Sequence, residues 1–299
     1  MKLMSQSLLV IALTLLSAWG CAPWLQSCFG IRDAPGRVNW DVVQEHALLA
    51  NTTYSEKEEI TQRYPGSWVH DIPDQQSRIV LVTDESSQTH WLGIRGTANT
   101  KNALMDAEYL KERDPKLGIY LHKGFHRLAR EAYEAFAPHL KPGYRLRVTG
   151  HSLGGAAAAI LCMYYDVDEK DVKSCFTFGQ PKVTNEEGVN RFWELPLKRF
   201  VDGEDIVPLV PPLTAASAIH GSYRHLGEEF ILRSEGHFLW LDKHDANRVL
   251  ISGTWANLFH ESVKDHFMRN YLKRISAVVE RVGEKKVRVA SASSAVRPE

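Results

Sequence analysis

Hydrophobic positions along this chain follow two different spacings. Five short runs are continuously apolar or alternate between apolar and polar residues, as β-strands do; these runs are 77–84, 89–96, 144–150, 172–179 and 197–207. Three longer stretches repeat an apolar residue every three or four positions, as one face of a helix does; these are 41–50, 125–140 and 152–165. Strands that alternate with helices predict an α/β domain built around a substantial sheet.

The C-terminal third adds a hairpin and a further helix to this pattern. The stretch "EFILRSEGHFLWL" predicts a hairpin that turns at Glu235-Gly236. Residues 262–265 resemble a capping box, which predicts a helix that starts near Val263 and carries His266 in its first turn. The expected buried stripe of that helix is Val263, Phe267, Tyr271, Ile275 and Val279. Residues 283–299 lack aromatic side chains, and we expect a solvated polar tail there.

The N-terminal segment has a different composition from the rest of the chain. Lys2 precedes an apolar run from Leu8 to Trp19, which is long enough for the core of a signal peptide but shorter than the ~20 residues of a spanning helix. We therefore expect residues 1–20 to be an export signal. Gly20-Cys21 resembles a lipoprotein cleavage site, at which Cys21 would carry lipid; plain cleavage and an uncleaved anchor are the alternatives. Either a secreted or an envelope-anchored protein is expected.

The rest of the chain is predicted to form one domain. No internal repeat and no Pro/Ser-rich linker interrupts residues 38–282, which follow a linker at 21–37 and precede the tail at 283–299. A chain of 299 residues with 44% hydrophobic residues can bury a large core. Lys plus Arg and Asp plus Glu number 36 each, so no excess charge favours a nucleic-acid partner. A monomer is expected, with Cys162 and Cys175 as buried free thiols.

The stretch "VTGHSLGG" is the strongest candidate for chemistry. A serine hydroxyl attacks a carbonyl only with a base beside it and open space in front of it. In G-x-S-x-G, a sharp turn from strand to helix provides that space, and the two glycines avoid collisions in the turn. Ser152 occupies this position between a predicted strand and a predicted helix. A glycine-rich turn in which Ser152 merely caps the helix is the alternative.

Seven segments, in order, resemble the class 3 (fungal-type) triacylglycerol lipase family, a group of α/β-hydrolases. The segments are "IRGTANTKNALMD", "HKGF", "VTGHSLGGA", "TFGQPKV", "DIVPLVPP", "YRHLGEE" and "DHFMRNY". The resemblance covers the chain from roughly Asn39 to Ile275. "TFGQPKV" followed by "DIVPLVPP" is the most specific combination of segments. The resemblance implies an α/β-hydrolase fold, with a mostly parallel central sheet flanked by helices and a short lid segment.

The acid and the base of a catalytic triad are sought after Ser152, because α/β-hydrolases follow the chain order Ser, Asp or Glu, His. Asp205 follows a predicted strand and occupies the family's acid position, with Asp202 and Glu204 as competitors. His266 lies beside the stripe of the C-terminal helix, within the matching "DHFMRNY" segment, and His260 is the alternative base. We predict a triad of Ser152, His266 and Asp205.

The resemblance also implies an oxyanion hole and a lid. The backbone N–H of Leu153, the residue after the nucleophile, is one expected donor. Thr97 in "IRGTAN" matches the family position of the second donor. The following segment matches the family's lid, where Leu104, Met105 and Tyr109 would contact lipid when the lid opens; an ordinary surface helix is the alternative.

The function expected from these residues is hydrolysis of carboxylic esters of lipids through an acyl-enzyme. The alternatives within enzymes are a phospholipase A1 and an esterase for soluble short-chain esters. A catalytically silent lipid-binding envelope protein is the alternative from another class. The expected partners are a lipid ester and, through the lid or Cys21, a membrane or lipid interface. No cofactor is expected, and the histidines lack a recognisable metal-ligand spacing.

Overall fold

The computed structural model describes most of the chain, and some sequence predictions fall outside that part. The described residues are 36–97, 110–203, 205–211, 221–248 and 266–295, with the side chains of the last range described to 283. The predicted export signal, Cys21, Glu204, His260 and the predicted lid with Leu104, Met105 and Tyr109 lie outside these residues.

An eight-stranded sheet forms the centre of the structure, in the order β1-β2-β3-β6-β7-β8-β9-β10. The strands are β1 (Trp68–Ile72), β2 (Ser77–Asp84), β3 (Thr89–Ile94), β6 (Arg145–His151), β7 (Val172–Phe178), β8 (Leu197–Asp202), β9 (Glu228–Leu232) and β10 (Phe238–Leu241). Neighbours from β3 to β9 pair in parallel, whereas β1, β2 and β10 pair antiparallel. The predicted mostly parallel sheet is therefore confirmed.

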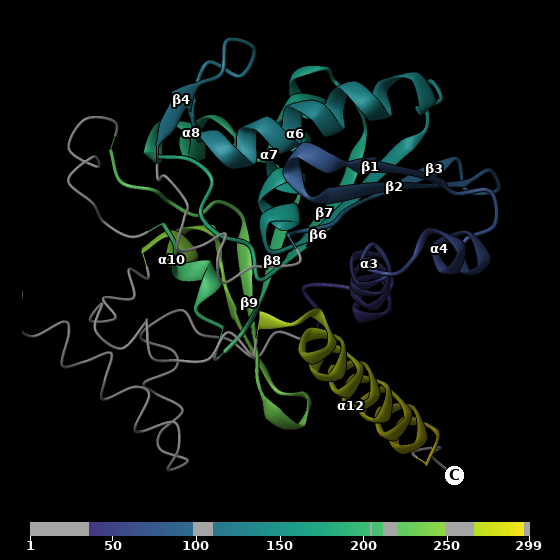
Figure 1. Ribbon diagram of the computed structural model, residues 1–299. Coiled ribbons are helices and arrows are strands. Elements are labelled where there is room, and N and C mark those ends of the chain that lie inside the picture. The colour runs from purple at the N-terminus through teal and green to yellow at the C-terminus, as the bar shows by residue number, and fades with distance from the viewer. Residues whose placement is uncertain (1–35, 98–109, 204, 212–220, 249–265, 296–299) are drawn as a thin grey trace, which may run out of the picture.

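Helices cover both faces of this sheet (Figure 1). On one face α6 (Lys123–Phe136) and α7 (Leu153–Val167) pack against the strands; on the other are α3 (Trp40–Thr52) and α12 (Met268–Ala295). The core on the α7 side contains mostly aliphatic residues, including four consecutive alanines, 156–159, which let that helix lie close to the sheet. The core on the α12 side is rich in aromatic rings from β7 to β10.

Shorter elements surround this core. They are the helices α4 (Lys57–Arg63), α8 (Glu186–Arg191) and α10 (Lys243–Arg248), the 3-10 turns η1 (Pro73–Gln75), η2 (Ala137–His139), η3 (Val207–Leu209) and η4 (Ser234–Gly236), and a two-stranded sheet of β4 (Lys111–Arg113) and β5 (Tyr120–His122). The turn η4 contains Glu235 and Gly236, both with positive φ, and joins β9 to β10. The hairpin predicted at Glu235-Gly236 is confirmed.

Two boundaries differ from the sequence predictions. The strand expected at 197–207 ends at Asp202, because the chain turns there and the Asp205 N–H donates to the Asp202 carbonyl at 2.9 Å. Helix α12 begins at Met268, so His266 lies two residues before the helix and not in its first turn. The predicted helix start at Val263 lies outside the described residues.

The region expected to be a polar tail is helical as far as Ala295. Helix α12 continues through residues 283–295 and projects away from the sheet at its C-terminal end (Figure 1). Alanine, lysine, arginine and glutamate are good helix formers, and no proline interrupts this stretch. Helix α12 therefore passes residue 283 without a break, and the solvated polar tail expected at 283–299 stays a prediction.

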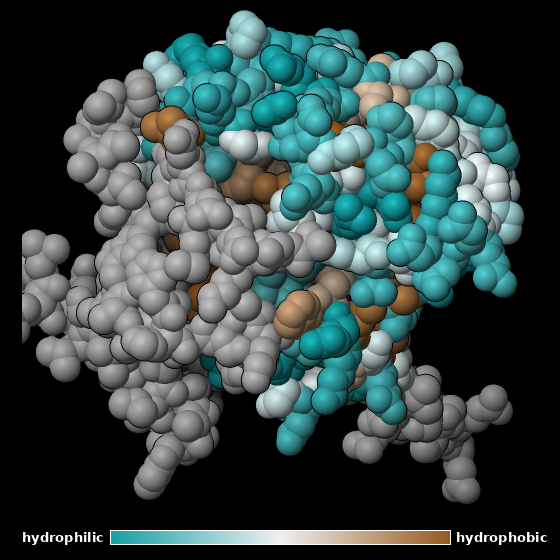
Figure 2. All heavy atoms as spheres, viewed as in Figure 1, coloured by the Kyte–Doolittle hydropathy of each residue, from teal (hydrophilic) through white to brown (hydrophobic). Residues whose placement is uncertain are grey.

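Cys162 and Cys175 are free and buried, as expected. Within the described residues, helices both long enough and apolar enough to cross a membrane are lacking. Figure 2 shows a largely hydrophilic described surface on one face, with small groups of hydrophobic residues, some of them beside the grey atoms.

Candidate active site

The turn that carries Ser152 joins β6 to α7. Strand β6 ends at His151, α7 begins at Leu153, and Ser152 between them has φ +60° and ψ −130°. This conformation is strained for a residue with a Cβ atom and is typical of a nucleophile on a sharp strand-to-helix turn. A Cβ atom at Gly154 would lie 2.2 Å from the Ile94 carbonyl oxygen, so only glycine allows α7 to start this close to β3.

Asp205 and His266 form a buried hydrogen-bonded pair beside this turn. The distance from His266 Nδ1 to Asp205 Oδ2 is 2.7 Å, and both side chains are almost completely buried. Asp205 Oδ1 accepts the Val207 N–H at 2.8 Å, and Oδ2 also accepts the hydroxyl of Tyr271. Burial and the nearby carboxylate of Asp205 raise the pKa of Tyr271 well above its usual value, so this hydroxyl keeps its proton and donates.

The competing carboxylate Asp202 has a different partner. Its Oδ2 accepts from Arg274 Nε at 2.6 Å, on the part of β8 that packs against α12. The structure therefore brings Asp205 to His266, whereas Asp202 forms an ion pair within the fold.

His266 is oriented to present its second nitrogen. Because Nδ1 bonds to a carboxylate, that nitrogen carries the proton and Nε2 carries the lone pair. Nε2 is buried and makes no hydrogen bond within the described part of the chain, Ser152 included. A Cβ atom at Gly179, after β7, would lie 2.7 Å from His266 Cε1 and 2.8 Å from Asp205 Oδ2. The pair therefore packs directly on the end of the strand next to β6.

The loop that follows β3 passes Ser152 closely. A Cβ atom at Gly96 would lie 3.1 Å from Ser152 Cβ and 2.6 Å from the His151 carbonyl oxygen. Thr97 is the next residue, so its backbone lies at the same end of the sheet. The first helical hydrogen bond of α7 runs from the Ala156 N–H to the Ser152 carbonyl at 3.1 Å, and the Leu153 N–H precedes it. Both predicted oxyanion donors thus belong to segments that adjoin Ser152.

The contacts of three contributors to the site were not predicted from sequence. Tyr271 was recognised as a buried helix residue, but its hydroxyl contact with Asp205 was not foreseen. His151 contacts the ring of His266 at a centroid distance of 4.5 Å and bonds to its backbone carbonyl. Tyr54, just after α3, bonds to His151 Nδ1 at 2.9 Å. For Tyr54 the sequence offers no signal, because its partner lies 97 positions away.

Comparison with known proteins shows which family part of this chain resembles. Residues 91–215 match the sequence model of the family described as Lipase (class 3). The matched part begins in β3 and includes the loop after β3, the Ser152 turn and Asp205. Tyr54 and His266 lie outside it.

Sequence relatives of this chain match it over part of their length. A lipase of Rhizomucor miehei is 30% identical over 166 residues, which are 50% of this chain and 44% of the relative. The secreted mono- and diacylglycerol lipase 1 of Fusarium solani is 29% identical over 165 residues, covering 51% and 46%. The chain thus spans less than half the length of these relatives.

A solved structure agrees over a longer part of the chain. The lipase of Rhizopus microsporus var. chinensis superposes with a TM-score of 0.62, covering 79% of this chain and 92% of that one at 21% identity. The predicted α/β-hydrolase fold is confirmed by this likeness.

Two basic side chains hold the loop after Asp205. Lys182 Nζ donates to the Leu209 carbonyl at 2.7 Å, and His225 Nε2–H donates to the Pro208 carbonyl at 2.7 Å. Burial lowers the pKa of Lys182 to about 8, with nearby Arg199 adding to the effect.

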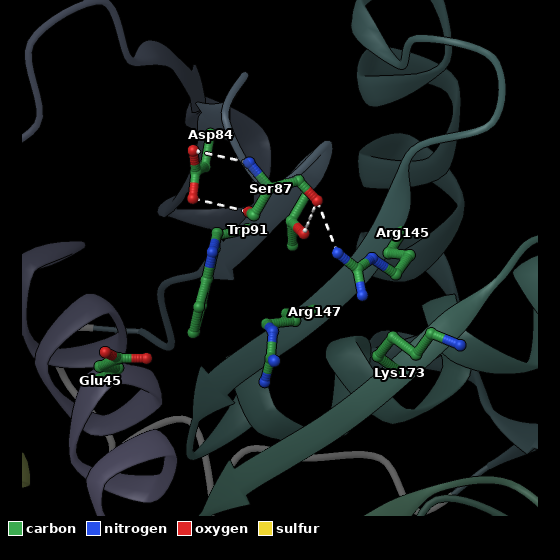
Figure 3. Close-up of a pocket in the computed structure, with 8 residues that line it drawn as sticks. Glu45, Asp84, Ser87, Trp91, Arg145, Arg147 and Lys173 are labelled. Atoms are coloured by element: carbon green, nitrogen blue, oxygen red, sulfur yellow. Dashed lines mark hydrogen bonds between the residues drawn. The ribbon is translucent and has the colours of Figure 1, made fainter.

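A separate pocket of about 210 Å³ lies at the end of the central strands opposite to Ser152 (Figure 3). Its lining includes Glu45, Asp84, Trp91, Arg145, Arg147 and Lys173. Arg145 begins β6, whereas Ser152 follows the other end of this strand. The pocket is therefore not part of the candidate active site.

Proposed function

We propose that this protein is a class 3 lipase that hydrolyses carboxylic esters of lipids, with Ser152 as nucleophile, His266 as general base and Asp205 as the residue that orients the base. The observation that carries the proposal is the buried His266–Asp205 pair, at 2.7 Å, next to the strained turn of Ser152. A hydroxyl, a carboxylate and an imidazole in this order along the chain are the machinery of ester hydrolysis in α/β-hydrolases.

The reaction follows from the proton positions. Nε2 of His266 takes the proton of the Ser152 hydroxyl while the oxygen attacks the ester carbonyl, and the imidazolium then gives that proton to the leaving alcohol. Water releases the acyl group from Ser152 by the same two transfers. Asp205 holds Nδ1 protonated and stabilises the imidazolium, and Tyr271 and the Val207 N–H keep the carboxylate in place.

The negative oxygen of the tetrahedral intermediate needs two donors on one side of Ser152. The Leu153 N–H at the N-terminus of α7 is one, and the positive end of the helix adds to its effect. The backbone N–H of Thr97 is the second, supported by the close approach of Gly96 to Ser152.

A lipid ester is the proposed substrate class, with acylglycerols favoured by the names of the relatives. Two hydrophobic side chains are exposed: Phe267, 46% exposed, follows the base in sequence, and Leu110, 48% exposed, follows the predicted lid in sequence. Such side chains suit contact with a lipid surface. We also propose export, which is supported by the apolar segment that ends at Trp19.

Two variants test the roles of the triad. Ser152→Ala should lower kcat by about 10⁶, and Asp205→Asn by about 10⁴, with folding preserved. Turnover of a chromogenic ester and circular dichroism measure both effects. Asp202→Asn is the matched control, because this buried carboxylate pairs with Arg274 and should cost stability but little turnover. Near-normal turnover by either triad variant would reject its assignment.

A panel of three substrates distinguishes the proposed function from the alternative functions. Rates on a triacylglycerol emulsion, phospholipid vesicles and a short-chain soluble ester are compared for one preparation. Preference for the emulsion supports an acylglycerol lipase, whereas preference for vesicles or for the soluble ester indicates a phospholipase A1 or an esterase. Absence of turnover on all three would favour a silent lipid-binding protein.

A further inference from the structure

A chain of hydrogen bonds crosses the candidate active site behind Ser152. The Gly96 N–H donates to the Tyr54 hydroxyl oxygen at 3.2 Å, and that hydroxyl lies 2.9 Å from His151 Nδ1. His151 Nε2 lies 2.6 Å from the backbone carbonyl oxygen of His266. Three separate segments, which carry the oxyanion loop, the nucleophile and the base, are thus joined by two side chains, the half-buried Tyr54 and the buried His151.

For a neutral His151, the two ends of this chain determine the direction of every bond. The Gly96 N–H can only donate, and the His266 carbonyl can only accept. His151 Nε2 must therefore carry the proton, which leaves Nδ1 to accept from the Tyr54 hydroxyl. That hydroxyl has one proton, which it gives to Nδ1 while its oxygen accepts from Gly96. The arrangement uses each donor and acceptor once and works only with a neutral His151.

The surroundings keep His151 in this form. Burial lowers the pKa of His151 well below its usual value, and the nearby ring of His266 acts in the same direction. Burial likewise raises the pKa of Tyr54 well above its usual value. A charged His151 would lose its acceptor and would repel the imidazolium that forms on His266 during attack, at a ring distance of 4.5 Å.

We propose that Tyr54 and His151 are positioning residues of this active site, which set the spacing between the Gly96-Thr97 backbone and the backbone of His266. This inference rests on the proposed function. The donors for the oxyanion and the base must converge on the same carbonyl group, and misplacement by about 1 Å can cost ~100-fold in rate. The Tyr54–His151 bridge connects those two segments directly, without touching the reacting atoms.

Removing one hydroxyl tests the bridge. Tyr54→Phe keeps the ring but removes the hydroxyl that bonds to His151 Nδ1 and the Gly96 N–H. The variant should lower kcat by about 10- to 100-fold, while KM changes less than about threefold. Tyr133→Phe is the matched control, because its hydroxyl donates to Asp168 at 2.5 Å, at the end of α7 away from Ser152, and its loss should leave kcat unchanged. Kinetics on a soluble ester and thermal unfolding are measured for both.

A double substitution shows whether the two residues act together. His151→Phe alone should lower kcat at least as much as Tyr54→Phe, and adding Tyr54→Phe to it should cause less than about a twofold further loss. Independent, multiplicative losses would contradict a shared bridge. His151→Gln, which can donate and accept at nearly the same reach, should recover part of the activity lost in His151→Phe, and it serves as the second variant if Tyr54→Phe does not fold.

The outcomes separate this inference from the proposed function. If the wild-type protein hydrolyses esters and Tyr54→Phe retains its kcat, the bridge has no positioning role and the proposed function stands. An equal loss in Tyr133→Phe would also overturn the inference, because it would show a general effect on folding. If the wild-type protein neither turns over esters nor reacts with a fluorophosphonate at Ser152, the proposed function fails, and the inference fails with it.

Discussion

Gly179 shows how closely single atoms are packed around the His266–Asp205 pair. Its φ is +58°, and a Cβ atom there would lie 2.7 Å from His266 Cε1 and 2.8 Å from Asp205 Oδ2. Asp205 is also held by hydrogen bonds from the Val207 N–H and the Tyr271 hydroxyl. A larger residue can be accommodated only if the pair moves.

Gly179→Ala should therefore lower both activity and stability. The positive φ costs roughly 1–2 kcal/mol for a residue with a Cβ atom, and the clash adds about 1–3 kcal/mol. Gly66→Ala is a suitable control, because Gly66 has φ +80° with open space around its Cβ position, so it carries only the first cost. Urea unfolding and ester turnover are compared for the two variants. Equal stability and full activity in both would show that no clash occurs at Gly179.

The candidate residues differed in how far the sequence could predict them. Ser152 is identified by its own neighbours, because the strand, the glycines and the helix are all local. Asp205 required the chain order and the family resemblance, and the contacts with His266 and Arg274 then separated it from Asp202. Tyr54 could not have been predicted, because its role arises only when β3, β6 and the start of α12 meet at one end of the sheet.

At the scale of elements, the strands were predicted well because their burial imposes a simple pattern. Residues 77–84 form β2 with the predicted bounds, and β7 ends one residue before the predicted position. The short edge strand β1 and helix α4 were not predicted, since β1 buries only Val69 and Ile72 and α4 buries only Ile60. Element ends set by hydrogen bonds, such as the turn after Asp202, carry no hydrophobic signal.

Helix α12 both completes the core and determines where His266 lies. Ile275 is fully buried in the cluster that joins α12 to α3 and the aromatic strands. Ile275→Ala should cost about 2–5 kcal/mol of stability, because a large buried side chain leaves a cavity. Activity should fall too, as the residues before the helix lose their support. Lys273→Ala, exposed on the same helix, should change stability by less than ~0.5 kcal/mol. Urea midpoints test this, and similar values for both variants would contradict it.

The whole molecule buries several histidines that its folded state keeps neutral. Burial lowers the pKa of His46 to about 3 and of His122 to about 4, and holds those of His151 and His225 well below the usual value. These side chains come from different parts of the fold, so their effect on stability is a property of the complete chain.

Stability should fall as the pH decreases below about 6.5. In the unfolded chain these histidines bind protons near pH 6.5, whereas in the folded chain they do so only at much lower pH. Above that pH these histidines are neutral in both the folded and the unfolded chain, and their effect on stability is absent. Below it, each histidine lowers the free energy of unfolding by up to ~1.4 kcal/mol per pH unit. Urea unfolding between pH 7.5 and 5 measures the slope, and His46→Gln should reduce it. A stability independent of pH over this range would contradict the burial of neutral histidines.

The central claim, that Ser152 is the nucleophile of an ester hydrolase, is tested most directly by covalent trapping. The purified protein is treated with a fluorophosphonate, digested, and analysed by mass spectrometry, with Ser152→Ala treated in parallel. We predict one adduct, on the peptide that contains Ser152, formed in step with the loss of ester turnover and absent from the variant. An adduct on another residue, or full loss of turnover while Ser152 stays unmodified, would contradict the claim.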